Sequence, residues 1–312
     1  MKKNLLVFLA LFFAFILVVF LGVAFGPTGF RITRDILLYI RIPRVILGIF
    51  AGSSLGIVGA AFQGILRNPL ADPYILGTSG GACVGGALAI IIGNLPIPAF
   101  AFIGAIIAIL LVYRLASFRG RIPQDTLLLS GVIVGTFTFS IVMLIMSLGG
   151  KSLEDILYLL MGHLGVVFDR NRIISFGVVW FFAMLSSGLI YARAREFNLL
   201  ASGEEEALTL GVEVEKLKKI VFILGSLIVG LTVSFCGAIG FIGLVVPHIA
   251  RLIVGPDHRI LIPVSALIGA ILIIVADIFA RSVAPFEIPV GVITALFGVP
   301  FFAYLLRKRK GT

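Results

Sequence analysis

The chain has 312 residues, of which 60% are hydrophobic and 13% are charged. A soluble domain carries about 25% charged residues, so this composition excludes an ordinary soluble enzyme or binding domain. The formal net charge of +10 would suggest a nucleic-acid partner for a soluble protein, but the cytoplasmic loops of membrane proteins also collect Lys and Arg. We therefore expect an integral protein of the lipid bilayer with no nucleic-acid partner.

Apolar runs near the ~20 residues that cross a bilayer recur along the whole chain. The first run follows a basic start, as in a secretory signal. It is longer than a signal core and no clear cleavage site follows, so we interpret it as a retained span. We predict ten transmembrane helices, at Leu5–Phe25, Val45–Leu66, Tyr74–Ile92, Ile97–Leu115, Leu127–Leu148, Ile173–Tyr191, Ile220–Ala238, Gly240–Val254, Ile260–Phe279 and Ile288–Leu306.

The stretch Ile220–Val254 contains no Asp, Glu or Lys. It is too long for one crossing and short for two. Gly237, Gly240, Gly243 and Pro247 predict a turn followed by a short, proline-interrupted helix. Broken helices are tolerated in a membrane where protein or a water-filled cavity surrounds them.

The distribution of cations predicts the orientation. With the N-terminus inside, 17 of the 25 Lys and Arg residues fall on the inner side and 8 on the outer side. This bias predicts that both termini are cytoplasmic. Four arginines between the first and second spans run against the bias, and they are Arg31, Arg34, Arg41 and Arg44.

The longest inner loop, residues 192–219, contains the acidic stretch ASGEEEALTLG at Ala201–Gly211. Ser202 can cap a helix whose first turn carries three glutamates, which suits the positive end of the helix dipole, and Gly211 can end it. Such a helix is too polar to span the bilayer and too short to be stable alone. Two interpretations stay open, a solvated loop helix and a helix that docks on a cytoplasmic partner.

Asp277 is the only acidic residue in the sequence that lies well inside a predicted span. A carboxylate in such a position is a candidate functional group. Arg281 follows four residues later and can pair with it, so we favour a local ion pair over a proton relay. Two function classes remain. One is a permease driven by a separate ATPase, and the alternative is an ion-coupled secondary transporter. The scarcity of ionisable groups inside the spans favours the first.

The sequence offers no convincing catalytic or metal-binding pattern. The stretch SLGGKS at Ser147–Ser152 ends like a nucleotide-binding P-loop, but Ile145 occupies the position of the first glycine. The histidines lack ligand spacing, and the cysteines are expected to be buried free thiols. We predict no catalytic residue, no bound cofactor and no metal site. The histidines and cysteines concerned are His163, His248, His258, Cys83 and Cys236.

A weak internal repeat suggests two halves. RVILGIFAGSSLGIVGAAFQG and KIVFILGSLIVGLTVSFCGAIG share a basic start and small residues at short intervals, which let helices approach closely in lipid. The first copy runs inward and the second outward, as in the inverted repeats of transporters. We predict a single transmembrane domain, residues 1–312, with halves at about 1–170 and 171–312.

Several long blocks resemble the FecCD-type permease subunits of ATP-binding-cassette (ABC) importers for iron-siderophores, haem and cobalamin. Together they cover nearly the whole chain after the first span. In chain order they are RIPRVILGIFAGSSLGIVGAAFQGILRNPLADPYILGTSGGA (Arg41–Ala82), LLLSGVIVG (Leu127–Gly135), GEEEALTLGV (Gly203–Val212), GAIGFIGLVVPHIARLIVGPDHR (Gly237–Arg259), and ADIFAR with EIPVGVITALFGVPFFAYLL (Ala276–Leu306).

The resemblance implies an all-α, cobalamin-importer-permease-like fold and a transport subunit rather than an enzyme. Two copies of the chain would form the translocation path for a metal chelate in the cytoplasmic (inner) membrane. Two ATPase subunits would bind on the cytoplasmic side and hydrolyse ATP. A substrate-binding protein would dock on the outer face.

The resemblance also implies site residues. Arginines on the outer face would be exposed rim charges that meet acidic residues of the binding protein, although lipid contact or pairing with local acids is the simpler account. The docking residues are Arg41, Arg44 and Arg281. The ATPase coupling helix comprises Ser202, Gly203, Glu204, Glu205, Glu206, Ala207, Leu208, Leu210 and Gly211. The cytoplasmic gate, in the loop RIPQDT, comprises Pro123, Gln124, Asp125 and Thr126.

Overall fold

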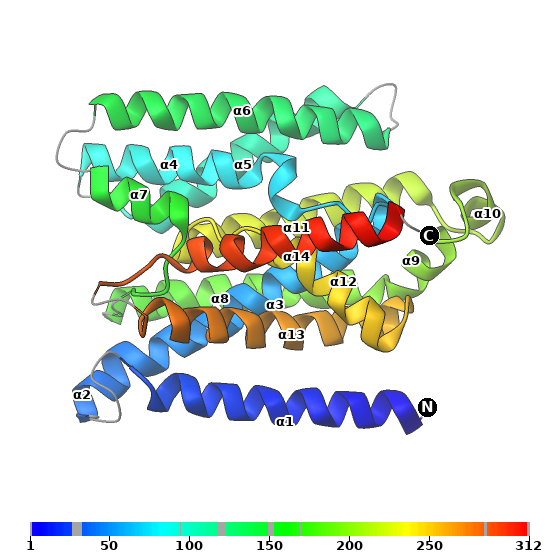
Figure 1. Cartoon of the computed structure of the whole chain (residues 1–312). Helices are drawn as coiled ribbons and strands as arrows, with labels where there is room; N and C mark the ends of the chain where they lie inside the picture. The colour runs from blue at the N-terminus through cyan, green and yellow to red at the C-terminus, as the bar shows by residue number, and fades with distance from the viewer. Residues whose placement is uncertain are drawn as a thin grey trace.

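The computed structural model describes residues 2–26, 33–93, 95–117, 123–148, 153–166, 168, 170–283 and 286–310. In these residues the protein is a bundle of helices without a strand (Figure 1). The helices are α1 (Lys2–Ala24), α2 (Arg34–Ile36), α3 (Ile42–Ile65), α4 (Thr78–Ile92), α5 (Ile97–Ala116), α6 (Gln124–Leu148), α7 (Leu153–Met161), α8 (Arg170–Ala192), α9 (Ala194–Leu200), α10 (Glu204–Thr209), α11 (Val214–Cys236), α12 (Ile242–Val254), α13 (His258–Ala280) and α14 (Val290–Lys310).

Each of the ten predicted spans corresponds to one helix. Within the described residues, seven helical stretches are long and apolar enough to cross a membrane, and α4, α12 and α14 provide three shorter apolar helices. The prediction of an all-α membrane protein with about ten transmembrane helices is therefore confirmed. The third span begins later than expected, because Pro73–Leu76 form a 3₁₀ turn that the side chain of Asp72 caps at the backbone N–H of Tyr74.

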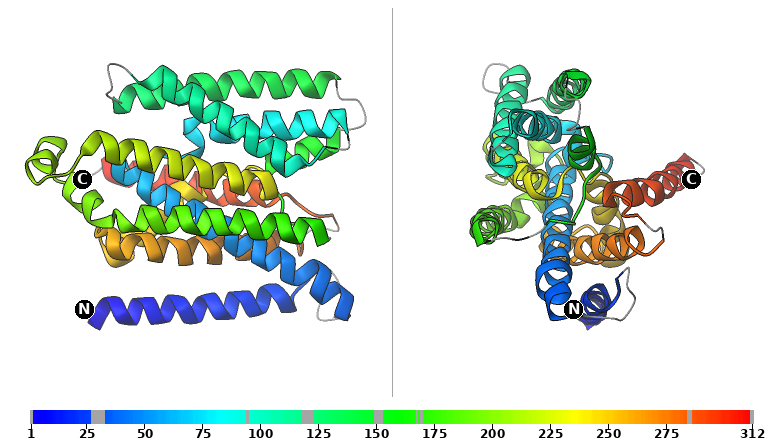
Figure 2. Two further views of the ribbon diagram at one scale, coloured as in Figure 1. Left: turned by 180° about the vertical axis from the view of Figure 1, so that it is seen from behind. Right: turned by 90° about the vertical axis from the view of Figure 1, so that its left-hand side faces the viewer.

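Helix α3 is the centre of the bundle. It runs through the middle in the end-on view, with α1 at the periphery (Figure 2). Small residues allow α3 to touch α13 with its backbone, because a Cβ atom at Gly52 would collide with the carbonyl of Gly269, and the reverse also holds. A Cβ at Gly59 would collide in the same way with Gly243 at the start of α12. The small residues of α3 thus bring three helices into close backbone contact.

The predicted break between the seventh and eighth spans is confirmed. Helix α11 ends at Cys236, and α12 begins at Ile242 with Pro247 inside it. Gly237 and Phe241 both have positive φ angles, of 66° and 69°. Phe241 is unusual, because bulky side chains rarely adopt a left-handed backbone. Protein surrounds the break, since Ala238 donates its N–H to the carbonyl of Leu159 in α7 and Ile239 donates to the hydroxyl of Tyr74.

The two ends of the bundle differ in construction. The start of α1, the end of α14 and the short helices α9 and α10 all lie at one end, where α10 projects beyond the long helices (Figure 1). Helices α2 and α7 lie at the opposite end. These are the predicted inner and outer ends. Part of the P-loop-like stretch, residues 149–152, and two gate-loop residues, Arg121 and Ile122, lie outside the described residues.

Candidate functional site

Helix α10 forms where the sequence predicts a short acidic helix. It spans Glu204–Thr209, and the three glutamates occupy its first turn. Gly211 adopts a φ of 85°. The N–H groups of Gly211 and Val212 reach back to the carbonyls of Leu208 and Ala207 at 3.0 and 2.9 Å. This pair of bonds is a Schellman motif, so the prediction that Gly211 ends the helix is confirmed.

The start of α10 differs from the prediction. Gly203, not Ser202, occupies the N-cap position, and no side chain caps the helix. The prediction that Ser202 caps the helix is wrong. The chain enters α10 through a φ of 143° at Gly203, a conformation that is open to glycine and strained for other residues. Ser202 therefore lies one residue before the N-cap position, in an exposed turn.

Helix α10 presents an unpartnered apolar tip. Ala207 is fully buried against the rest of the chain, whereas Leu208 and Leu210 are 58% and 62% exposed. Lipid does not account for these two leucines, because α10 projects past the ends of the long helices (Figure 1). These two leucines make the tip of α10 a candidate contact surface for another protein.

The first residue of α10 contacts the predicted gate. Gln124 begins α6, and its side-chain amide donates a 3.0 Å hydrogen bond to the carboxylate of Glu204. The Nζ atom of Lys218 in α11 lies 3.0 Å from the same carboxylate and 3.2 Å from Glu215. Of the predicted gate residues, Gln124 and Thr126 are partly buried, and Pro123 and Asp125 are exposed. The sequence predicts the two sites separately, and the structure joins them.

A second polar contact ties α9 to the start of α13. The side-chain amide of Asn198 donates to Asp257 at 2.6 Å, and its carbonyl accepts from the backbone N–H of His258 at 2.8 Å. The His258 ring lies 5.3 Å from the ring of Phe197. Burial opposes ionisation of Asp257, but the hydrogen bonds from Arg259 N–H and Asn198 outweigh it and hold the pKa of Asp257 below its ordinary value. Asp257 is therefore an anionic cap for α13 at neutral pH.

The predicted docking arginines lie together at the α2 end of the bundle, but they are buried. Arg41, Arg44 and Arg281 are 2%, 4% and 4% exposed. Arg41 donates to the carbonyls of Val23 and Ala24 at the end of α1. The expectation that these side chains are exposed rim charges is therefore wrong, because each one is turned into the protein and satisfies partners there.

Two carboxylates complete this outer arginine cluster. Asp277 lies 2.6 Å from Arg44 and 3.3 Å from Arg281, which confirms the predicted pair of Asp277 with Arg281 at the end of α13. Glu287, just before α14, lies 2.6 Å from Arg44 and is 47% exposed. Arg281 also donates to the carbonyl of Gly22 in α1 at 2.6 Å. The cluster thus ties α1, α3, α13 and the segment before α14 together.

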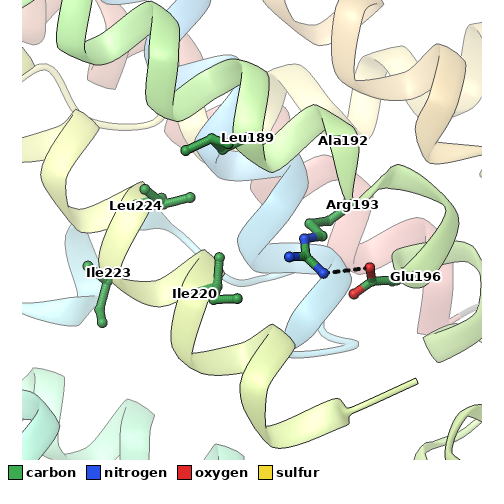
Figure 3. Close-up of a pocket in the computed structure, with 7 residues that line it drawn as sticks. All are labelled: Leu189, Ala192, Arg193, Glu196, Ile220, Ile223 and Leu224. Atoms are coloured by element: carbon green, nitrogen blue, oxygen red, sulfur yellow. Dashed lines mark hydrogen bonds and ion pairs between the residues drawn. The ribbon is translucent and has the colours of Figure 1, made fainter. Parts of the chain in front are cut away.

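A groove of about 620 Å³ lies between α8 and α11 at the predicted inner end (Figure 3). Its walls are mostly aliphatic, and its charged pair, Arg193 and Glu196, is closed by a 2.8 Å ion pair. We therefore regard the groove as a lipid-facing crevice beside α9. The lining residues are Leu189, Ala192, Arg193, Glu196, Ile220, Ile223 and Leu224.

Sequence reasoning missed the residues that connect these sites. Asn198 and Glu287 each acquire their role from a partner far along the chain, 59 and 243 residues away. Lys218 pairs with Glu204, 14 residues earlier and on a different helix. Lys218 carried a weak signal, since a lysine this close to an apolar span requires an anion if it is buried. The two cysteines are buried and free, as predicted. Among the described residues, no group of three His, Cys, Asp or Glu side chains could hold a metal ion.

Known proteins share both the sequence and the fold. The cobalamin import system permease protein BtuC of Halobacterium salinarum is 46% identical over 275 residues, which cover 87% of this chain and 73% of that protein. The hemin transport system permease protein HmuU of Yersinia pestis is 37% identical over 284 residues, which cover 88% of this chain and 83% of that protein.

The structural comparison agrees. A solved structure described as an inward-facing conformation of a transporter of the metal-chelate ABC type superposes with a TM-score of 0.86. It covers 98% of this chain and 99% of that chain, at 28% sequence identity. The profile of the FecCD transport family matches residues 4–308. The chain therefore belongs to the FecCD transport family and is a multi-pass membrane permease subunit of an ABC importer.

Proposed function

We propose that two copies of this chain form the translocation path for a metal chelate, with two ATPase subunits bound at the α10 end and a substrate-binding protein at the α2 end. The observation that carries the proposal is α10 itself. Its base is packed on the bundle, and its tip exposes two leucines beyond the long helices. A helix of six residues gains its stability from packing, so an exposed apolar tip suits a groove in a partner subunit.

The orientation follows from the same proposal. ATP is hydrolysed in the cytoplasm, so the α10 end faces the cytoplasm. Both ends of the chain then lie on the cytoplasmic side of the cell membrane, in agreement with the excess of Lys and Arg at that end. Closure of the ATPase dimer on ATP would move the two α10 helices, and the bundles would rock between inward-facing and outward-facing states. Residues 123–126 at the start of α6 would form the cytoplasmic gate.

Because the three arginines are buried, we propose that the binding protein contacts one of them, Arg44, in place of Glu287. Glu287 is the half-exposed member of the outer arginine cluster, and it covers Arg44. With three arginines and two carboxylates, the cluster retains one net positive charge. An acidic side chain of the binding protein could therefore replace Glu287 at Arg44 while Asp277 keeps Arg281 paired.

The substrate class follows from the relatives, which carry cobalamin or hemin according to their names. We propose a bulky metal chelate that the binding protein delivers. The test is uptake by a transport-deficient host that expresses the permease with an ATPase and a binding protein encoded beside it. Cyanocobalamin, hemin and a ferric siderophore are supplied in turn. Uptake of none of the three, or uptake without the ATPase, would contradict the proposal.

The alternative, an ion-coupled secondary transporter, finds little support in the geometry. Such a transporter needs an ionisable group that binds and releases the coupling ion. Asp277, the candidate from the sequence, is held by two arginines and is 1% exposed. Transport that follows an imposed pH gradient without ATP, and only when Asp277 is present, would favour the alternative.

A further inference from the structure

The short helices α9 and α10 are joined to the bundle by two polar contacts that lead to different long helices. We infer that Glu204 and Asn198 are positioning residues that transmit a movement of α10 to α6 and to α13, respectively. The inference rests on the proposed role of α10 as the coupling helix. It adds the route by which a movement at the ATPase reaches the helices of the path.

Glu204 is placed to pull on α6. Its carboxylate accepts from Gln124 at the first residue of α6, and Gln124 also reaches the carbonyl of Ile65 at the end of α3, at 3.4 Å. Lys218 anchors the other side of Glu204, and its side chain is only 6% exposed. A buried ammonium group holds its anion firmly, because separating the two leaves an uncompensated charge. A shift of Glu204 therefore carries the start of α6 with it.

Asn198 is placed to pull on α13. The carbonyl of its side chain accepts from both the backbone N–H and the Nδ1 atom of His258, at 2.8 and 3.0 Å. Its amide group donates to Asp257, so the orientation of the amide is fixed by its partners. Asp257 in turn caps α13 at Arg259. The first turn of α13 is thus bonded directly to α9.

The unit formed by α9 and α10 is rigid enough to act on both helices at once. Phe197, Leu200 and Ala207 are all fully buried, so the two short helices share the packed core. Packed interfaces shift between discrete arrangements rather than deform gradually. Because α13 crosses α3 in backbone contact at Gly52 and Gly269, a movement of α13 also reaches the central helix.

The test uses the complete complex, with permease and ATPase in lipid nanodiscs, and a thiol reporter on α6. Thr126→Cys places the reporter beside Gln124, whereas the native Cys83 and Cys236 are buried. The rate at which a charged maleimide labels the reporter is measured with and without vanadate trapping of the ATPase. We expect trapping to change this rate by about fivefold or more, which is the lower range of measured couplings between sites.

Glu204→Ala tests the first contact. Lys218 keeps Glu215 as a partner at 3.2 Å, so the variant is expected to fold. Labelling is compared only in complexes that have trapped vanadate, and in these the variant should lose the change in labelling. Glu213→Ala is the matched control, because Glu213 lies on the same loop and forms an exposed pair with Lys216. The control should keep the full change in labelling.

Asn198→Asp tests the second contact. It is nearly isosteric, but it places a carboxylate against Asp257. The double variant Asn198→Asp with Asp257→Asn restores a donor and an acceptor. A second reporter, Arg259→Cys at the exposed start of α13, should respond to trapping in the parent and in the double variant, and fail to respond in Asn198→Asp. Equal melting temperatures for the three would separate positioning from a loss of folding.

The outcomes distinguish this inference from the proposed function. If both single variants respond like the parent, or if the parent traps vanadate without any change at Thr126→Cys, the inference is wrong and the proposed function stands. If the ATPase does not copurify and a Leu208→Cys probe cannot be crosslinked to it, the proposed function fails first. Loss of response in either single variant, with trapping intact, supports the inference.

Discussion

The two ends of the bundle use charge in opposite ways. At the α2 end, the predicted outer end, three arginines and Asp277 are almost fully buried, and they bond helices that are far apart in the sequence. At the α10 end, the predicted inner end, Glu205 and Glu206 are exposed. Among the described contacts of α10, Glu204 pairs with one cation, the buried Lys218. The α2 end is held together by buried charge, whereas the α10 end exposes charge and two leucines.

This difference teaches that an unusual charge in a membrane protein is not by itself an interaction surface. Arg41 and Arg44 violate the positive-inside bias, and α10 is unusual for its acidity. Both the arginines and α10 were predicted from the sequence to be docking elements, but α10 is exposed and the arginines are buried. Burial of guanidinium groups is expensive unless they are paired and hydrogen-bonded. The outer cluster meets that condition through Asp277, Glu287 and the carbonyls at the end of α1.

The largest loss of stability is expected for Asp277→Asn. This change leaves Arg281 without a carboxylate and Arg44 with Glu287 alone, so two guanidinium groups remain buried with too little negative charge. Removal of one partner from a buried ion pair typically costs about 3–5 kcal/mol. The measurement is the melting temperature of the purified permease in detergent. A melting temperature equal to that of the parent would show that the outer end is not locked by charge.

A smaller loss is expected for Arg41→Met, which keeps the aliphatic length but removes the hydrogen bonds to Val23 and Ala24. Hydrogen bonds from a charged group contribute about 1.5–3 kcal/mol. Because these bonds hold the end of α1, the variant should also become sensitive to proteolysis near α1. Arg34→Met is the control, since Arg34 is exposed. Equal protease resistance in both variants would argue against a role of Arg41 in holding α1.

The comparison also shows what could be predicted from the sequence. The spans follow from apolar runs, the broken helix from its glycines and Pro247, and the end of α10 from Gly211. These signals are local, and each confirmed element depends on neighbours within a few residues. The pair of Asp277 and Arg281 belongs to the same class, because four residues on a helix bring them to one face.

The remaining features could not be predicted because their partners are distant. Arg44 and Asp277 are separated by 233 residues, and Gln124 and Glu204 by 80. Nothing near Arg44 in the sequence indicates that it pairs with a buried carboxylate on another helix. The N-cap of α10 was missed for a different reason, because Gly203 adopts a backbone conformation that replaces a side-chain cap.

Glu287→Gln tests whether Arg44 has a structural role only or also contacts the binding protein. The pair with Arg44 is half-exposed on the side of Glu287, so its loss should cost about 1 kcal/mol or less. If Arg44 receives an acidic side chain of the binding protein, removal of the competing carboxylate should speed association at low salt, because charge at an interface acts mainly on the on-rate. The on-rate is measured by surface plasmon resonance at two ionic strengths. An unchanged on-rate would leave the outer arginine cluster with a structural role only.

The smallest effect on stability is expected for Leu208→Asp, which nevertheless should abolish coupled transport. Leu208 is 58% exposed and lies at the tip of α10, so its side chain gives the isolated permease little packing energy. A surface substitution of this kind changes stability by about 0.5 kcal/mol or less. In a groove of the ATPase, however, the same position would bury a carboxylate without a partner, which costs far more than the lost apolar contact. The variant should therefore melt like the parent, insert into membranes normally and fail to drive uptake with the ATPase. Thr209→Asp is the matched control, because it adds the same charge to the neighbouring exposed residue of α10 without removing an apolar side chain.

Normal ATP-driven uptake by Leu208→Asp would contradict the docking of α10. A fall in melting temperature as large as that of Asp277→Asn would remove the contrast between the two ends, because α10 would then belong to the packed core and not to an interface.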